Sequence, residues 1–88
     1  MKKLITLEWE IHDKRNEDKG FKTGTSKLVV KCKTYADAIN NAIFFADHLP
    51  TCELERNNID LEEYREYPYC RYYYATKLSK ILKIEDAE

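Results

Sequence analysis

The side chains best suited to hold a metal ion in this chain are three cysteines and two histidines. They are Cys32, Cys52, Cys70, His12 and His48. Structural zinc sites bring their ligands in close pairs such as Cys-x₂₋₄-Cys, whereas the closest pair here is His48 and Cys52 with Pro50 between them. An unpaired cysteine packs as a small apolar side chain, and we interpret all three cysteines as core residues on predicted strands. We therefore expect no metal site and no cofactor.

Catalysis and phosphate binding are weakly indicated. A nucleophile needs a base and an orienting group within hydrogen-bond reach, and no strained turn or helix start follows Cys70, which could pair with His48. Residues 20–27 differ from the phosphate loop Gly-x₄-Gly-Lys-Ser/Thr in spacing and in the position of the lysine, so we interpret them as a hairpin turn. A chain of 88 residues is also short for a deep substrate cavity. We predict a binding protein rather than an enzyme.

Two groups of side chains could contact a protein partner. On a predicted strand, Tyr69, Arg71 and Tyr73 would point outward together, and Tyr and Arg are enriched in interface hot spots. An acidic stretch would steer the chain toward a basic partner. Its acidic residues are Glu53, Glu55, Asp60, Glu62, Glu63 and Glu66. The alternatives are that the tyrosines cover a sheet face as an amphipathic skin and that the charge run is an ordinary solvated surface.

The uneven charge leaves nucleic-acid binding as the alternative function. The net charge is −1, but residues 1–33 hold nine Lys/Arg against five Asp/Glu, and residues 34–70 hold two against eight. A basic hairpin beside a tyrosine-rich strand can bind phosphates and stack bases. The basic residues are Lys14, Arg15, Lys19, Lys22, Lys27, Lys31 and Lys33. Acidic residues interleave with them, so direct nucleic-acid binding ranks below a protein partner.

The N-terminal third predicts a β-hairpin. Apolar and polar residues alternate over residues 4–12, which is typical of a half-buried strand. Residues 25–33 predict a second strand after a long charged loop over 13–24. The inward positions are Ile5, Leu7, Trp9, Ile11, Ser26, Leu28, Val30 and Cys32. Matching the two apolar faces places Trp9 opposite Leu28.

A helix is predicted over residues 35–49, with Thr34 as its N-cap and Pro50 ending it. Its apolar stripe is Tyr35, Ile39, Ala42, Ala46 and Leu49, widened by Phe45. The alanines should allow close approach to a sheet.

The C-terminal half predicts two further strands and a second helix. One strand lies near residues 52–56 and another over 69–76, and a short helix over 77–85 places Leu78, Ile81 and Leu82 at helical spacing. Residues 59–67 stay open between a loop and a short helix. The chain is thus predicted to form a single α+β domain over residues 1–88. Its small antiparallel sheet follows a β-β-α-β-β order, with one main helix on one face and a short C-terminal helix.

In its general appearance the chain resembles small bacteriophage accessory proteins, including the anti-CRISPR and other anti-defence inhibitors. The likeness consists of a short lone domain, a charged hairpin, the helix entry Thr34-Tyr35-Ala36-Asp37-Ala38 and the tyrosine-rich strand. It covers the whole chain, contains no family motif and transfers no site. It implies a stoichiometric inhibitor that binds a host protein, such as a nucleic-acid-handling protein of the CRISPR type.

The sequence also indicates a compartment. No apolar signal segment or membrane-spanning run is visible, and the odd, widely spaced cysteines do not form a disulfide pattern. We expect a cytoplasmic protein, in the host cytoplasm if a phage encodes it, with no membrane partner. A monomer and a homodimer both stay open.

Overall fold

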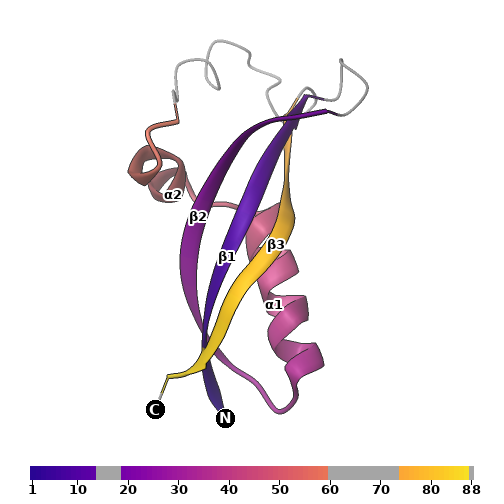
Figure 1. Ribbon diagram of the computed structural model, residues 1–88, viewed down its shortest axis with the longest axis vertical. Helices are drawn as coiled ribbons and strands as arrows, with labels where there is room; N and C mark the ends of the chain where they lie inside the picture. Colours follow the sequence, from indigo (N-terminus) through magenta and orange to yellow (C-terminus); the bar gives the residue numbers. More distant parts are fainter. Residues whose placement is uncertain (14–18, 60–73, 88) are drawn as a thin grey trace.

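The computed structural model describes residues 1–13, 19–59 and 74–87 (Figure 1). The elements are β1 (Lys2–Asp13), β2 (Lys19–Lys31), α1 (Tyr35–Asp47), α2 (Thr51–Arg56) and β3 (Tyr74–Asp86). The strands form an antiparallel sheet in the order β2-β1-β3. In Figure 1, α1 lies along one face of this sheet, and both chain ends lie at the same end of it. The α+β class is confirmed, whereas the described elements follow the order β-β-α-α-β instead of β-β-α-β-β.

Strand β1 shows the predicted alternation along its whole length. Ile5, Leu7, Trp9 and Ile11 are fully buried, and the residues between them are half-buried. Because β1 is the central strand, both of its edges are paired and its apolar side chains fill the layer between the sheet and α1. The predicted first strand is therefore confirmed and runs slightly longer than residues 4–12.

The predicted faces of β2 are confirmed, but its predicted register is wrong by four residues. Trp9 pairs with Gly24, not with Leu28. A shift by an even number keeps every side chain on its own face, so Ser26 and Val30 are still buried. Gly24 explains the choice of register, because a Cβ atom there would lie 2.3 Å from Cζ2 of Trp9. The indole ring needs the space that a glycine leaves.

This register also shortens the hairpin connection. Residues 19–24 belong to β2, so the long loop predicted over 13–24 is wrong for that part, and the hairpin turn predicted over 20–27 is wrong as well. Charged and glycine residues gave no strand signal there, yet the backbone continues to pair with β1 through Lys19.

The helix predicted over residues 77–85 is wrong, because these residues lie in β3. The strand is irregular: its register against β1 shifts between Thr6 and Leu7 and again between Glu8 and Trp9. Its apolar residues pair as Leu78 with Trp9, Ile81 with Leu7 and Ile84 with Ile5. Each bulge inserts one residue into β3, so the residues of β3 that pair with the buried residues of β1 are spaced by three positions instead of the usual two. Of the strand predicted over 69–76, only residues 74–76 lie in the described part, and they belong to β3.

Helix α1 begins as predicted, with the Thr34 hydroxyl accepting a hydrogen bond from the Asp37 N–H at 3.2 Å. Its buried residues are Ala38, Ala42 and Ala46, each with no exposed surface. The predicted stripe is therefore only partly right, because Tyr35 and Ile39 are exposed. Alanines at every fourth position form one narrow row along a helix, and that row lets α1 approach the sheet closely.

The strand predicted near residues 52–56 is wrong, because α2 occupies this segment. Pro50 is the N-cap of α2, and α1 has already ended at Asp47. Leu54 of α2 is buried, while Cys52 is exposed. The prediction of three core cysteines thus holds for Cys32 and fails for Cys52, and Cys70 lies outside the described residues.

Candidate functional site

Most of the predicted partner-binding residues lie outside the described part of the chain. These are Asp60, Glu62, Glu63, Glu66, Tyr69, Arg71 and Tyr73. The two described members, Glu53 and Glu55, lie on α2 and differ in exposure: Glu53 is 7% exposed, whereas Glu55 is exposed. Glu53 therefore belongs to the core and is not available to an external partner.

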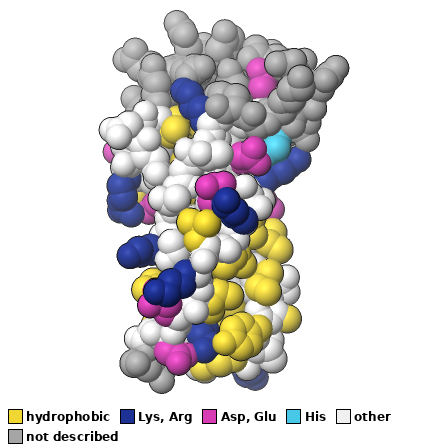
Figure 2. All heavy atoms as spheres, in the orientation of Figure 1, with side chains coloured by type: hydrophobic (Ala, Val, Ile, Leu, Met, Phe, Trp, Pro, Cys, Tyr) yellow, Lys and Arg dark blue, Asp and Glu magenta, His cyan; other side chains and the backbone are white. Residues whose placement is uncertain are grey.

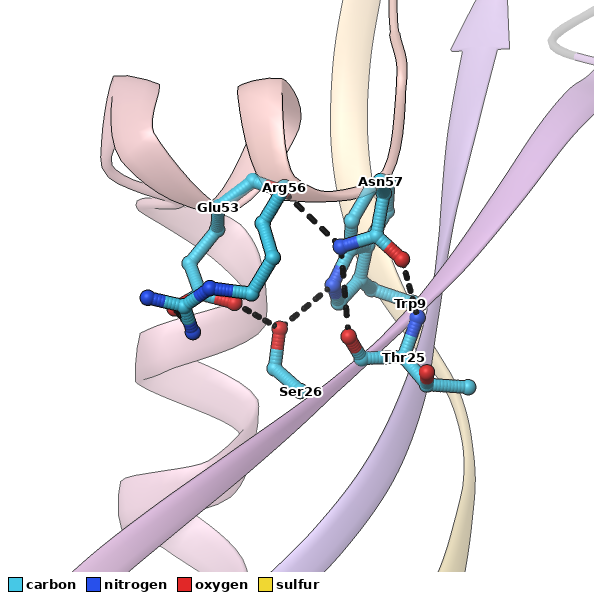
Figure 3. A network of polar contacts seen from close by, with 6 residues as sticks. All are labelled: Trp9, Thr25, Ser26, Glu53, Arg56 and Asn57. Carbon is cyan, nitrogen blue, oxygen red and sulfur yellow. Dashed lines mark hydrogen bonds and ion pairs between the residues drawn. The ribbon is translucent and has the colours of Figure 1, made fainter.

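Glu53 is the end of a buried chain of hydrogen bonds (Figure 3). The indole Nε1 of Trp9 donates to the Ser26 hydroxyl at 2.9 Å, and that hydroxyl donates to Glu53 Oε2 at 2.5 Å. Arg56 Nη1 donates to Glu53 Oε1 at 2.7 Å. Both carboxylate oxygens therefore have partners, which a buried charge requires. Since these residues come from β1, β2 and α2, the network fixes α2 against the sheet.

Asn57, directly after α2, pairs with the outer edge of β2. Its Oδ1 accepts the Thr25 N–H at 3.1 Å, and its Nδ2 donates to the Thr25 carbonyl at 3.2 Å. Nδ2 also donates to the Glu53 carbonyl at 2.8 Å. The amide thus satisfies the two backbone groups that a neighbouring strand would otherwise pair.

Large apolar side chains are exposed on α1. Tyr35, Ile39, Ile43 and Phe44 have exposed fractions of 57%, 38%, 40% and 66%. Tyr35, Ile39 and Ile43 follow one another at four-residue spacing on one side of the helix, and we call these three residues the α1 patch. Phe44 lies on another side of α1, where it lines a hollow beside β2. Figure 2 shows hydrophobic side chains gathered at the lower right, where Figure 1 places α1. The helix therefore buries its alanines and half-buries Phe45, while the apolar residues beside the alanine row stay exposed.

A groove separates α1 from the edge of β2. Two hollows of ≈ 310 Å³ and ≈ 520 Å³ follow it, and both are lined by Lys31 and Asn41. The smaller hollow is also lined by Leu28 and Val30 of β2 and by Phe44, Phe45 and His48 at the end of α1. The His48 ring stacks on the Phe44 ring with centroids 4.4 Å apart. The smaller hollow is thus mainly apolar and aromatic, whereas the larger one is lined mostly by polar and charged residues, among them Lys31, Lys33 and Asp37.

The sheet face away from α1 is rich in charge. The register aligns Lys27, Thr6 and Lys83 across all three strands. Further lysines on this face are Lys31 on β2 and Lys77 and Lys80 on β3. Central strand β1 places Glu8 and Glu10 between them, and Glu8 accepts a hydrogen bond from the Ser79 hydroxyl at 3.1 Å. Of the other basic residues that the sequence singled out, Lys22 lies on β2 and Lys33 lies just after it. Lys14, Arg15 and the side chain of Lys19 lie outside the part of the chain that the structure describes.

One ion pair joins the two ends of the chain. The Lys3 ammonium donates to Asp86 and lies 5.2 Å from the centre of the Tyr35 ring. The hydrogen bond to Asp86 raises the pKa of Lys3 above its ordinary value, and the same bond lowers the pKa of Asp86. This pair ties β1 to β3 beside the start of α1.

The described histidines and cysteines, His12, His48, Cys32 and Cys52, are dispersed. His12 lies on β1 with its Nε2 3.3 Å from Glu10 Oε2, and His48 lies at the end of α1. Within residues 1–13, 19–59 and 74–87, no three His, Cys, Asp or Glu side chains gather as metal ligands. No helix in this part of the chain is long and apolar enough to cross a membrane.

Comparisons of the chain with protein-family models, with curated proteins and with solved structures found no match. Sequence patterns overlooked Asn57, Ile43 and Phe44. The four-residue spacing of Ala38, Ala42 and Ala46 was the available signal, because a buried row through these alanines leaves Ile43 and Phe44 outside it.

Proposed function

We propose that this chain is a non-catalytic protein-binding domain that contacts its partner through the α1 patch. One observation carries the proposal: the only fully buried residues of α1 are alanines, and Tyr35, Ile39 and Ile43 beside them are exposed. Apolar patches rimmed by polar residues mark interaction sites on soluble domains. Asn40 and Asp47 supply such a rim, because they are exposed and lie next to Ile43 on the surface of the helix.

The composition of the patch favours a protein as the partner. An aromatic side chain such as Tyr35 provides a large contact area with little loss of side-chain entropy, and such side chains anchor many protein interfaces. Burying the exposed part of one such side chain contributes about 1 kcal/mol or more. The three neighbouring residues of the α1 patch therefore can form the apolar centre of an interface.

A host protein is the proposed partner, and inhibition of that protein is the proposed role. The resemblance to bacteriophage inhibitors supports both, and the acidic stretch supports a partner with a basic, nucleic-acid-handling surface. Glu55 is the member of this stretch that is exposed within the described residues. The cytoplasm of a host cell is the corresponding location.

Direct nucleic-acid binding is the second candidate, and the lysines on the outer sheet face favour it. Lys27 and Lys83 flank Thr6 in one row, which would place two cations against a phosphate backbone. Glu8 and Glu10 on the central strand reduce the positive potential of this face, which is why it ranks second.

Protein capture with a matched pair of variants tests the proposal. The purified chain is immobilised and incubated with bacterial lysate, with and without nuclease treatment, and its partners are identified by mass spectrometry. The test variant carries Tyr35→Ser with Ile43→Ser, and the control carries Asn40→Ser with Asp47→Ser on the same helix. Circular dichroism confirms that both fold.

We expect one protein to be captured in near-equal amount by the unmodified chain and the control. The test variant should bind it about 30-fold more weakly, the equivalent of about 2 kcal/mol of lost apolar burial. Equal capture by both variants would refute the α1 patch as the site. Captured proteins that all disappear after nuclease treatment would favour the nucleic-acid candidate, and Lys27→Glu with Lys83→Glu would then abolish the capture.

A further inference from the structure

Strand β2 presents a regular backbone edge to the groove beside α1. Two pairs of hydrogen bonds show which residues direct their backbone N–H and C=O groups away from β1. Cys32 exchanges both backbone hydrogen bonds with Met1, each at 2.9 Å, so the backbone N–H and C=O groups of Cys32 point toward the β1 side of the sheet. At the other end, Thr25 turns both backbone groups away from β1 and toward Asn57.

The residues between these two points follow the same alternation. The pairing of β1 with β2 has no register shift between Lys2 and Ile11, and backbone groups in an antiparallel ladder alternate in direction. Lys27, Val29 and Lys31 therefore direct their N–H and C=O groups outward. Among the described residues, no hydrogen bond reaches these groups.

The opposite edge of the sheet is different. Strand β3 contains two register shifts against β1, and bulges interrupt the spacing that a further strand needs. Asn57 demonstrates on β2 the two-bond contact that an added strand would make. Asn57 pairs with the backbone groups of Thr25 and leaves those of Lys27, Val29 and Lys31 available for an added strand.

The side chains around the edge specify what could occupy it. Residues of an added strand opposite Leu28 and Val30 would face α1 and contact Phe44 and Phe45 in the groove. Residues opposite Lys27 and Lys31 would lie on the other face, beside two exposed ammonium groups. Apolar residues suit the first positions, and acidic residues suit the second.

A second copy of this chain fits poorly. If two β2 edges paired antiparallel around Val29, Lys27 of each copy would face Lys31 of the other. Like charges directly opposite one another destabilise strand pairing. The lysines thus select against self-pairing and in favour of an acidic segment.

We infer that the β2 edge binds an extended segment of a partner protein by strand addition, with two acidic residues four positions apart and apolar residues between them. This inference rests on the proposed function, since it assigns part of the protein partner to a second surface. Strand addition is an established mode of peptide recognition, in which backbone bonds supply affinity and alternate side chains supply specificity. The core Glu-Val-Thr-Val-Glu satisfies the pattern in either strand direction.

The test uses the synthetic peptide acetyl-Gly-Ser-Glu-Val-Thr-Val-Glu-Ser-Gly-amide and the full chain labelled with ¹⁵N. We expect the amide signals of Lys27, Val29 and Lys31 to shift and their hydrogen exchange to slow on titration. Lys27→Glu with Lys31→Glu should weaken binding about tenfold, because two favourable charge pairs become unfavourable. The matched control, Lys80→Glu with Lys83→Glu on β3, should change binding less than twofold.

A backbone change separates strand addition from charge attraction. Joining a synthetic segment 1–31 to a segment that begins at Cys32 yields the full chain with an N-methyl group on Val29, which removes the central outward donor. We expect this chain to lose peptide binding at least tenfold while its circular dichroism spectrum is retained.

Three results would overturn the inference: equal weakening by the two lysine pairs, unchanged binding after N-methylation, or no binding at millimolar peptide. None of them affects the proposed function, because the α1-patch variant alters Tyr35 and Ile43, which do not line the groove. Concentration-dependent dimerisation that N-methylation of Val29 abolishes would identify a second copy as the occupant and would also overturn it.

Discussion

Replacing Gly24 with alanine should destabilise the fold, because the added methyl group meets the ring of Trp9. The new Cβ would lie 2.3 Å from Cζ2, 2.4 Å from Cη2 and 2.9 Å from Cε2 of Trp9. The indole cannot move aside easily, because it is fully buried and its Nε1 is bonded to Ser26. Gly24 has no positive φ angle, so the effect of the substitution is steric.

The size of the effect follows from two contributions. Overpacking a well-packed core costs about 1–3 kcal/mol, and displacing the indole from the Ser26 hydroxyl costs about 1 kcal/mol more. The sum of about 3 kcal/mol is a large part of the total stability of a small domain. For a chain of this size, the free energy of unfolding falls by about 1 kcal/mol for each molar of urea. The urea concentration at the unfolding midpoint should therefore fall by about 3 M.

Urea unfolding followed by fluorescence measures this directly, because Trp9 is the only tryptophan in the chain. A double-mutant cycle with Trp9→Phe supplies the control, since phenylalanine lacks the outer ring atoms that the new methyl group meets. Followed by circular dichroism, Gly24→Ala should cost less than about 1 kcal/mol in the Trp9→Phe background. A Gly24→Ala change below about 0.5 kcal/mol, or an equal cost in both backgrounds, would mean that Trp9 does not face Gly24 and that the register is different.

Two further predictions concern polar contacts. Glu53→Gln should lower the free energy of unfolding by about 1–2 kcal/mol, because it removes the charge that accepts one buried hydrogen bond from Ser26 and one partly buried hydrogen bond from Arg56. In the same urea experiment, the exposed control Glu55→Gln should change it by less than about 0.5 kcal/mol. The ion pair of Lys3 and Asp86 should stabilise the fold between about pH 4 and about pH 10. Its contribution disappears as the pH falls through the lowered pKa of Asp86 or rises through the raised pKa of Lys3. In an NMR titration, the carboxyl pKa of Asp86 should lie below 3.8. It should return toward 3.8 in Lys3→Met but not in the control Lys83→Met. An Asp86 pKa that Lys3→Met does not change would contradict the pairing.

The sequence predicted the parts of the fold that depend on a simple repeat. The alternation in β1 and the cap at Thr34 were both correct, because each is determined by neighbouring residues. The register of β2 was not determined in this way. Any even shift satisfies the apolar pattern equally well, and the deciding contact, Trp9 over Gly24, joins residues distant in the chain.

The failures at the C-terminal half have equally specific causes. A three-residue apolar repeat at Leu78, Ile81 and Ile84 fits either a helix or a strand with two bulges, and only pairing with β1 selects the strand. At α2, the alternation of Cys52, Leu54 and Arg56 was a strand pattern by coincidence, whereas Pro50 at the N-cap was the correct signal. The candidate site was missed because exposure of α1 residues depends on which row the sheet covers.

The division of α1 into a buried alanine row and an outward apolar set has a consequence for how this protein can evolve. Positions 38, 42 and 46 leave no room for a larger side chain, so they should be intolerant of change in any saturation mutagenesis experiment. Phe44, exposed to 66%, can instead vary with little effect on folding. A lineage that follows a changing target could therefore alter specificity at such positions while its scaffold stays constant, and the same arrangement makes α1 a convenient helix for grafting new recognition sequences.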